Sequence, residues 1–182
     1  MMTIVYFDCM PSPLGEMVLA SDGDALSGAW FEGQRYQPRL GPAWQRRPDL
    51  PLLRRAAAEL AEYFAGERIV FSVPLAPVGT PFQRDVWQAI AGVPYGETIA
   101  YRELAVRARR PESIRAAGAA TGRNPLSIVV PCHRIVGADG ALTGYAGGLA
   151  RKRALLALEH AAIAAAPAPR LAPGATFAHA PT

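Results

Sequence analysis

One short segment combines the residue types of an activated nucleophile. The sequence VVPCHRIVGADGALTGYAGG, residues 129–148, places Cys132 between Pro131 and His133. A thiol becomes nucleophilic when a base or a positive charge favours its thiolate form, and a histidine oriented by a third group can supply that base. Neighbouring side chains point apart on regular structure, so the pair needs a bridging water or a sharp bend, which Pro131 favours. An isolated Cys-His pair is nevertheless more typical of a buried structural cysteine beside a core histidine.

The other cysteine and histidine residues are too scattered for a disulfide or a metal site. Cys9 is the second cysteine, and the remaining histidines are His160 and His179. This distribution matches no familiar zinc-ligand spacing, so we expect no bound metal. The start, MMTIVYFDCMPSP, lacks the basic region and longer apolar core of a signal peptide, and no stretch approaches the roughly 20 apolar residues of a membrane span. We therefore expect a cytoplasmic protein with two free thiols.

Length and charge indicate a chain with a basic second half. The 182 residues, 51% of them hydrophobic, suffice for one medium domain or two small ones. Residues 1–79 contain seven arginines and nine acidic residues, a net charge of −2, whereas residues 80–160 contain ten arginines and Lys152 against six acidic residues, a net charge of +5. Arginine suits phosphate contact, but a high-GC genome also replaces lysine by arginine without structural reason. Charge alone leaves nucleic-acid binding open.

The first half consists of short strands followed by a helix. TIVYFDC, GEMVLAS and LSGAWF are separated by the turn sequences PSPLG and DGD and predict a small antiparallel sheet. LLRRAAAELAEYFAG has apolar residues at helical spacing and ends at Gly66. RIVFSVPL then resumes extended structure. We place a first domain at residues 1–75 and a linker at 76–79.

The second half opens with a strong helix signal. Thr80, Pro81 and Gln83 predict a capping box with proline at the first helical position of a helix through FQRDVWQAIAGV. Trp87 shares the inner face of that helix, so we expect it in the core and not on a base-stacking surface. A second helix is predicted from about Ile99, and a third, RRPESIRAAGAATG, ends at its last glycine. These two short helices form a helix-turn-helix pattern.

The last predicted elements surround the cysteine. NPLSIVV indicates a buried strand or extended connection that carries Cys132 into the interior, and Asp139-Gly140 marks a tight turn. GGLARKRALLALEHAA predicts a final helix, whose expected inner stripe is Leu149, Arg153, Leu156 and His160. The second domain is placed at residues 80–163. Residues 164–182, rich in alanine and proline, are predicted to be disordered or loosely laid on the surface.

Together these segments resemble the O6-alkylguanine-DNA alkyltransferases, suicide proteins that repair alkylated guanine. The resemblance extends from GTPFQRDVWQAIAGVPYGETIAYRELA through RAAGAATGRNPLSIVVPCHRIVG to TGYAGGLARKRALLALE, residues 79–159, and Asn-Pro before Pro-Cys-His-Arg is its most specific part. It implies an α/β (α+β) fold of two domains. The first is ribonuclease-H-like, a small sheet plus a helix; the second is a mainly helical, winged-helix-like DNA-binding domain that carries the cysteine.

The resemblance implies a role for each active-site residue. Cys132 matches the alkyl acceptor, His133 the residue that takes the thiol proton through a water, and Glu159 the carboxylate that sets the tautomer of the histidine. Without the resemblance, Glu159 would be a solvated carboxylate near a helix end. Asn124 matches the hinge asparagine that ties the recognition helix to the active-site loop. Tyr145 matches a phenol that contacts the flipped guanine and helps protonate the leaving base.

The implied base pocket adds three residues. The carbonyl groups of Cys132 and Ile135 would accept hydrogen bonds from the guanine exocyclic amine. Ala146 stands where some relatives have a serine that contacts the alkylated oxygen, which leaves that role to backbone N–H groups around Ala146 and Gly147. This departure puts in doubt which alkyl groups are accepted.

The resemblance also implies a DNA-binding surface. Arg115 matches an arginine finger that fills the hole left by the extruded nucleotide, and Tyr101 matches a tyrosine that pushes on the neighbouring phosphate. The implied set also includes Thr121, Arg123 and Ala116. Base flipping is required because the alkyl carbon must meet sulfur in line, which is impossible inside a duplex. The family works from the minor groove of double-stranded DNA; Arg115 alone would be an ordinary surface cation.

The implied reaction is one displacement that leaves an S-alkylcysteine, without a cofactor. We expect a monomer that can cluster along DNA; repair of O4-alkylthymine stays open. Some family members bind zinc in the amino-terminal domain, but that region has only Cys9 and no histidine here, so no zinc is expected. Three alternatives remain: a non-catalytic alkyltransferase-like lesion-binding protein, which would lack the acceptor cysteine; a cysteine hydrolase; and a transcription regulator.

Overall fold

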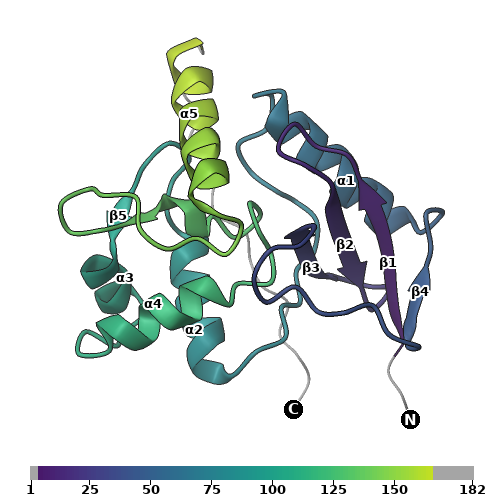
Figure 1. The fold of residues 1–182 in the computed structure, drawn as a ribbon, viewed down its shortest axis with the longest axis horizontal. Coiled ribbons are helices and arrows are strands. Elements are labelled where there is room, and N and C mark those ends of the chain that lie inside the picture. The colour runs from purple at the N-terminus through teal and green to yellow at the C-terminus, as the bar shows by residue number, and fades with distance from the viewer. Residues whose placement is uncertain (1–3, 166–182) are drawn as a thin grey trace.

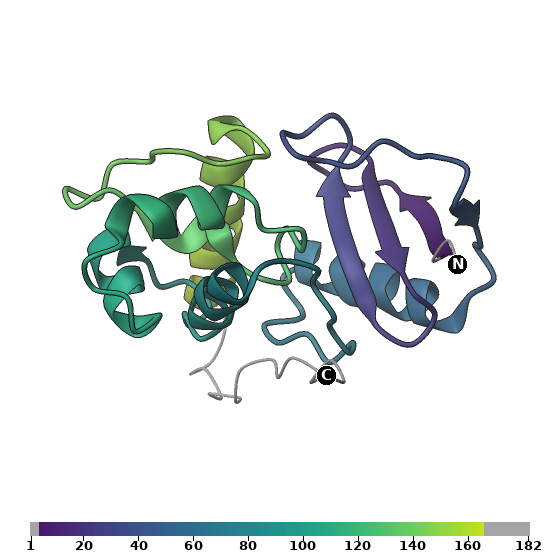
Figure 2. The ribbon, with the colours of Figure 1, turned by 90° about the horizontal axis from the view of Figure 1, so that it is seen from below.

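The computed structural model describes residues 4–165, which form two lobes lying side by side (Figure 2). The first lobe contains a sheet and one helix, and the second contains the remaining helices around a short two-stranded ladder (Figure 1). Within the described residues, no helix is both long and apolar enough to cross a lipid bilayer.

The sheet of the first lobe has the strand order β3-β2-β1-β4. Its strands are β1 (Val5–Met10), β2 (Met17–Ser21), β3 (Leu26–Phe31) and β4 (Trp44–Arg46). β1 and β3 both pair antiparallel with β2, which confirms the three predicted strands. β4 was not predicted from the sequence, because its three residues are too few to show alternation, and it pairs parallel with β1.

The helix α1 (Pro51–Phe64) covers one face of this sheet, as predicted (Figure 1). Gly66, with φ of +76°, adopts the left-handed conformation that ends many helices. On the other face the rings of Trp30 and Trp44 lie 6.3 Å apart. Gly28 is required beneath them, because a Cβ atom there would lie 1.8 Å from the Trp30 ring. The face opposite α1 therefore carries a pair of tryptophan rings, of which Trp30 is buried and Trp44 is half-buried.

The segment after α1 is extended, as predicted, but it adds no further strand to the sheet. Within residues 68–75, only Leu75 forms a β-bridge, with Leu26. Phe71, Val73 and Leu75 are buried while the residues between them are more exposed, so the segment keeps the alternation of extended chain. It packs against the core of the first lobe without joining the sheet.

The second lobe begins with α2 (Pro81–Ala91), and the predicted capping box is present. Thr80 accepts a hydrogen bond from the Gln83 N–H, and the Gln83 side chain accepts one from the Thr80 N–H. Trp87 is buried and donates its indole N–H to the Ala120 carbonyl over 2.9 Å. The prediction that Trp87 belongs to the core is confirmed.

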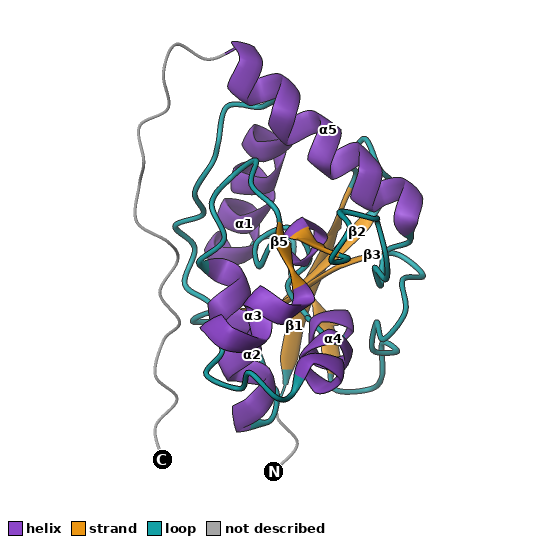
Figure 3. Cartoon of the chain, turned by 90° about the vertical axis from the view of Figure 1, so that its left-hand side faces the viewer, coloured by secondary structure: helices purple, strands orange, loops and turns teal. Residues whose placement is uncertain are grey.

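The helices α3 (Tyr101–Arg107) and α4 (Ile114–Gly122) form the predicted helix-turn-helix pair, which groups with α2 below β5 in Figure 3. The second helix starts two residues later than expected. Ile99 and Ala100 instead form β5, which pairs parallel with β6 (Ile135–Val136), directly after the cysteine segment.

The final helix α5 (Leu149–Ala165) is present, but the predicted inner stripe is confirmed only at Leu156. Leu149, Arg153 and His160 are exposed; the buried residues are Lys152, Leu155, Leu156 and Glu159. A prediction that places only apolar residues inside misses this face of α5. The face buries the charged side chains of Lys152 and Glu159, whose partners come from other segments of the chain. The helix also continues past residue 163, and residues 166–182, which hold most of the predicted tail, lie outside the described residues.

Candidate active site

The chain reaches Cys132 through a tight turn attached to the first lobe. The β3 residue Ala29 donates its N–H to the Pro125 carbonyl and accepts from the Ser127 N–H, both over 2.8 Å. Ile128 follows with φ of +74°, a left-handed conformation that is strained for a β-branched residue, at a cost of about 1–3 kcal/mol. The predicted buried connection is therefore partly right: the segment is buried, but it turns sharply after pairing with β3.

Asn124 ties this turn to the end of α4. Its amide nitrogen donates to the Val130 carbonyl over 2.8 Å, and its amide oxygen accepts from the Leu126 N–H over 3.0 Å. The same nitrogen lies 3.1 Å from Cys132 Sγ. The asparagine thus fixes the loop conformation and directs a donor at the sulfur, which favours the thiolate.

Cys132 opens a single 3₁₀ turn, η1 (Cys132–Arg134), in the interior. Only 4% of the residue is exposed. Burial raises the pKa of the thiol, while the Asn124 amide and the Lys152 charge act in the opposite direction. Because burial outweighs these effects, the resting group is a protonated thiol, and its reaction as a nucleophile requires a base.

His133 is fully buried, and its Nε2 lies 2.7 Å from Glu159 Oε1. An ionised carboxylate can only accept, so we assign the ring proton to Nε2. The other nitrogen, Nδ1, is buried and has no hydrogen-bond partner among residues 4–165. Burial lowers the pKa of His133, opposed by the hydrogen bond and charge of Glu159. The histidine is therefore neutral, with Nδ1 free to accept a proton.

Four further donors surround the Glu159 carboxylate. Arg134 donates to both oxygens over 2.9 and 3.0 Å, and the Gly96 N–H donates to Oε2 over 2.9 Å. The Tyr63 hydroxyl donates to Oε1 over 2.8 Å. Burial opposes ionisation, but the hydrogen bonds from His133 and Arg134 and the charge of Arg134 outweigh it and hold the pKa of Glu159 well below its usual range. Glu159 is a fixed anion.

The Gly96 donor depends on the absence of a side chain. Gly96 has φ of +77°, and a Cβ atom there would lie 2.0 Å from Ile163 Cδ1. Glycine therefore allows the backbone N–H to approach α5 closely enough to reach the carboxylate.

Lys152 is a buried cation on the same face of α5. Its ammonium group donates to the carbonyl oxygens of Ile135 and Thr143. Burial lowers the pKa of Lys152 to about 8, and the neighbouring Cys132 acts in the opposite direction. The Ile135 carbonyl, predicted to bind guanine, thus already accepts one hydrogen bond, and the Cys132 carbonyl accepts another from the Ile135 N–H. Each oxygen keeps one further lone pair.

Tyr145 lies next to this loop with a buried hydroxyl that has no hydrogen-bond partner among the described residues. Burial raises the pKa of Tyr145, so the phenol keeps its proton and can act as a donor. The next two predicted base-binding residues contact the first lobe. The Ala146 carbonyl accepts from the Arg35 N–H over 3.1 Å, and a Cβ atom on Gly147 would lie 3.3 Å from the Phe31 ring.

Four of the five predicted DNA-binding residues lie partly or fully exposed on α3 and α4 or directly after α4. Arg115 and Ala116 are exposed on α4, and within residues 4–165 Arg115 forms no ion pair. Arg123 follows α4 and stacks 4.6 Å above the Tyr36 ring. The Tyr101 hydroxyl donates to the Thr143 carbonyl over 3.3 Å. These residues leave an accessible cationic helix face.

Thr121 is separated from the other predicted DNA-binding residues. Its side chain is buried, and its hydroxyl donates to the Ala117 carbonyl over 2.8 Å within α4. Helical periodicity explains this placement, because Thr121 lies four residues after the buried Ala117 and so on the same inward face.

Sequence reasoning missed three side chains that contact the site, those of Tyr63, Arg134 and Lys152, and also the Gly96 N–H. Arg134 is part of the quoted Pro-Cys-His-Arg motif, and the motif itself was the signal. Lys152 lies seven residues before Glu159, two helical turns, which places both on one face. Tyr63 lies 96 residues before Glu159 in sequence and gave no local signal.

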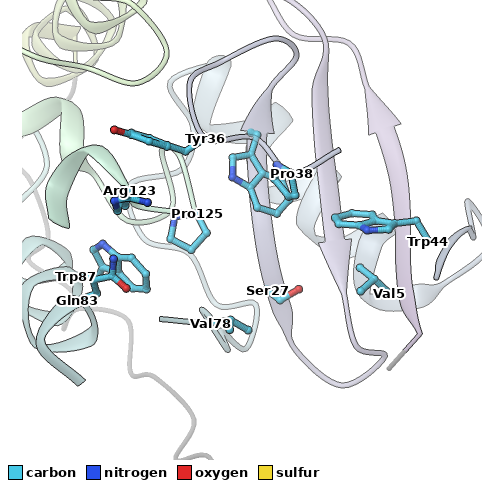
Figure 4. Close-up of a pocket in the computed structure, with 11 residues that line it drawn as sticks. Val5, Ser27, Tyr36, Pro38, Trp44, Val78, Gln83, Trp87, Arg123 and Pro125 are labelled. Atoms are coloured by element: carbon cyan, nitrogen blue, oxygen red, sulfur yellow. The ribbon is translucent and has the colours of Figure 1, made fainter. Parts of the chain in front are cut away.

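A separate cavity of about 400 Å³ lies between the lobes and does not include the cysteine. Figure 4 shows Trp87 and Arg123 on the side of the second lobe and Trp44 and Val5 on the side of the sheet. Within the described chain, no three histidine, cysteine or acidic side chains gather to hold a metal ion.

Two family models match the two lobes. The 6-O-methylguanine DNA methyltransferase ribonuclease-like domain matches residues 5–77, and the 6-O-methylguanine DNA methyltransferase DNA binding domain matches residues 81–161. With the sheet in one lobe and the helix-turn-helix in the other, these matches confirm the predicted two-domain fold class.

Individual relatives extend the match over most of the chain. A "Methylated-DNA--protein-cysteine methyltransferase" from Haemophilus influenzae is 45% identical over 159 residues, 87% of this chain and 88% of the relative. The Mycobacterium leprae protein of the same name is 44% identical over 157 residues, 86% of this chain and 93% of the relative. A crystal structure of Mycobacterium tuberculosis OGT in complex with DNA is similar with a TM-score of 0.80 and 42% identity, covering 86% of this chain and 94% of that one. The chain therefore belongs to the 6-O-methylguanine DNA methyltransferase family.

Proposed function

We propose that this protein repairs DNA by transferring the alkyl group of O6-alkylguanine to the sulfur of Cys132. The single observation that carries the proposal is the buried thiol beside a neutral histidine whose Nε2 is held by Glu159 over 2.7 Å. The names of the relatives and the DNA complex of Mycobacterium tuberculosis OGT support DNA as the partner.

The chemistry follows from the protonation states of the site. The Cys132 proton passes through a water to His133 Nδ1, and the thiolate attacks the alkyl carbon. The S–C bond forms as the C–O6 bond breaks, and the electron pair of that bond goes to guanine. Tyr145 donates a proton to the leaving base and later regains one from His133. The net change moves the alkyl group to sulfur and the thiol proton to guanine.

The reaction consumes the protein. The product is a thioether, which has neither the acyl carbon nor the leaving group that hydrolysis by the same residues would need. Each protein molecule therefore repairs one lesion, and the reaction needs no cofactor because the base and the acid are both side chains.

We further propose that DNA binds along α4 from the minor groove. Arg115 would occupy the place of the extruded base, Tyr101 would press on the adjacent phosphate, and Arg123 would contact a second phosphate. Ala116 is exposed and has a small side chain, so α4 can approach the DNA backbone closely. Thr121 is left out of this surface because its side chain is buried. Residues 1–75 and 80–163 would act as the two domains of a monomer, joined by residues 76–79.

The test is intact-protein mass spectrometry after mixing the protein with excess duplex that contains one O6-methylguanine, followed by peptide mapping. The expected result is a stoichiometric gain of one methylene on the Cys132 peptide and restored guanine in the DNA. Unmodified protein that still binds the duplex would overturn the proposal in favour of lesion binding alone. Repeated turnover would indicate a hydrolase.

A further inference from the structure

A residue of the first lobe reaches the ion pair at the active site. Tyr63 lies in the last turn of α1, is fully buried, and donates its hydroxyl to Glu159 Oε1 over 2.8 Å. The same hydroxyl lies 3.5 Å from His133 Nε2. Tyr63 therefore contacts both members of the pair that controls the thiol, although it comes from the lobe that holds neither of them.

We propose that Tyr63 is a positioning residue for alkyl transfer, by which the first lobe fixes the oxygen of Glu159 that orients His133. The inference rests on the proposed function and deepens it, because it assigns the first domain a part in the reaction. Tyr63 touches neither the sulfur nor the substrate, so it acts only through Glu159 and His133.

The direction of the hydrogen bond is determined by its environment. Burial raises the pKa of Tyr63, with the Glu159 charge adding to the effect, so the hydroxyl keeps its proton and donates it. Oε1 is the oxygen that also faces His133 Nε2. The tyrosine therefore draws negative charge away from the histidine while it prevents the carboxylate from rotating. Without the hydroxyl, Oε1 would be a stronger partner for a protonated His133.

The packing around Tyr63 holds its hydroxyl in place and provides a matched control. Its ring contacts Phe71 and Tyr95, with centroids 5.8 and 6.0 Å away. The Tyr95 hydroxyl is also buried, but it has no hydrogen-bond partner among residues 4–165. Tyr63→Phe and Tyr95→Phe each remove one buried phenolic oxygen from the same aromatic cluster, and only the first removes a hydrogen bond to Glu159.

The expected effect is a slower transfer with an altered pH dependence. The charged groups that act on His133 are unchanged by the substitution: Glu159 and Lys152 from α5, and Arg134 from η1. Burial raises the pKa values of Cys132 and Tyr95, so both groups stay neutral in this pH range. Tyr63→Phe should lower the transfer rate constant at pH 8 about 10-fold, as for loss of other groups that orient a functional histidine. In a plot of the transfer rate against pH, the acidic limb of the Tyr63→Phe variant should move to higher pH, because His133 is protonated more readily. Tyr95→Phe should keep the wild-type rate and profile.

A second measurement, the protonation of His133, does not depend on alkyl transfer. Nitrogen-15 NMR of the histidine rings without DNA, assigned with His133→Gln, follows protonation of His133 directly. The midpoint should rise in Tyr63→Phe and stay unchanged in Tyr95→Phe. In the wild-type protein, the hydroxyl proton of Tyr63 should exchange slowly and give a nuclear Overhauser effect to the His133 ring, which tests the contact without any substitution.

The outcomes separate the two proposals. If wild-type Cys132 takes up no methyl group, the proposed function fails, and the NMR titration still tests the contact. If the wild type transfers the group while Tyr63→Phe matches Tyr95→Phe in rate, pH profile and His133 titration, the inference is wrong.

Discussion

The Glu159 carboxylate lies in the interior as an anion, and the donors around it determine its role. Its oxygens accept from His133, Tyr63, Arg134 and the Gly96 N–H. A buried charge is tolerated when it is paired and fully hydrogen-bonded. A carboxylate stabilised so strongly as an anion does not take up the thiol proton. Glu159 therefore orients and polarises His133, and the free Nδ1 is the base.

The first prediction concerns Cys132, the residue that accepts the alkyl group. Cys132→Ala should abolish transfer of a radiolabelled methyl group from duplex DNA, because the variant lacks the sulfur that accepts the group. DNA affinity, measured by gel shift, should stay within about twofold of wild type, a change of roughly 0.4 kcal/mol. Cys9→Ala is the control and should transfer fully, since Cys9 lies on β1 in the first lobe. Residual labelling of the Cys132→Ala protein would contradict the assignment.

A second prediction concerns Arg115, which is exposed on α4 and has no ion-pair partner within residues 4–165. Arg115→Ala should slow repair in duplex DNA about tenfold or more, because nothing then offsets the few kcal/mol needed to unstack the base. Reaction with a free alkylated guanine base should be nearly unchanged, since no flipping is needed. Arg84→Ala removes the same charge from an exposed position of α2 and should affect duplex repair less. Equal losses on duplex and free base would exclude the finger role.

At the scale of elements, the two helix starts of the second lobe differ in a measurable way. Thr80 caps α2 with its hydroxyl, whereas Ser113 at the start of α4 makes no side-chain capping bond. Thr80→Ala should reduce the free energy of unfolding by about 1 kcal/mol, and Ser113→Ala by much less. Urea unfolding of both variants tests this. Similar losses in the two variants would show that the capping box does not stabilise α2.

Local patterns predicted the elements that carry their own signals. α2 begins with a capping box, α1 has a clear helical period, and β2 is a short apolar run between turn sequences, so each was found from the sequence. β4 was missed because it exists only through pairing with β1. The buried face of α5 was misplaced because Lys152 and Glu159 are stabilised inside by partners from other segments. Tertiary contacts, not local propensity, decide such positions.

In the active site, too, residues within one local segment were predicted, whereas their geometry was not. The cysteine, histidine and asparagine were found because they lie within one recognisable segment, residues 124–133. Their geometry was not predictable, because the turn at Ile128 has a left-handed φ that β-branched residues avoid. Thr121 was placed on the DNA surface by resemblance, and its inward position follows only from the orientation of α4.

At the scale of the whole molecule, the two lobes are joined around the reactive loop. Gln34 accepts a hydrogen bond from Ser127 over 3.0 Å, Arg35 donates to Ala146, and Arg151 stacks 4.7 Å from the Phe31 ring. On the side of the first lobe, these contacts come from the last residue of β3 and the loop that follows it. The first lobe therefore supports the active-site loop on one side and the Glu159 carboxylate on the other.

Acid should destabilise the whole fold through the buried pair. The pKa values of His133 and Glu159 are both lowered from their ordinary values of 6.5 and 4.5, so the unfolded chain binds more protons in that range. The free energy of unfolding should therefore fall as the pH drops below about 6.5, and fall further below about 4.5. Guanidinium unfolding between pH 2.5 and pH 8 measures this, and Glu159→Gln should flatten the part of the curve below about pH 4.5. Stability that rises on acidification from pH 7 to pH 5 would contradict the assignment.

The order of these residues along the chain also determines when the protein becomes reactive. During synthesis Tyr63 emerges first, the Cys132-His133 pair follows, and Glu159 comes last, 96 residues after Tyr63. Until α5 has been synthesised, the Cys132 sulfur is present but His133 has no carboxylate to orient it. At a synthesis rate of roughly 5–20 residues per second, the time between Cys132 and the end of α5 is only seconds. Because each molecule can react only once, it matters that the oriented base needed for the reaction is complete only when the last helix has been synthesised.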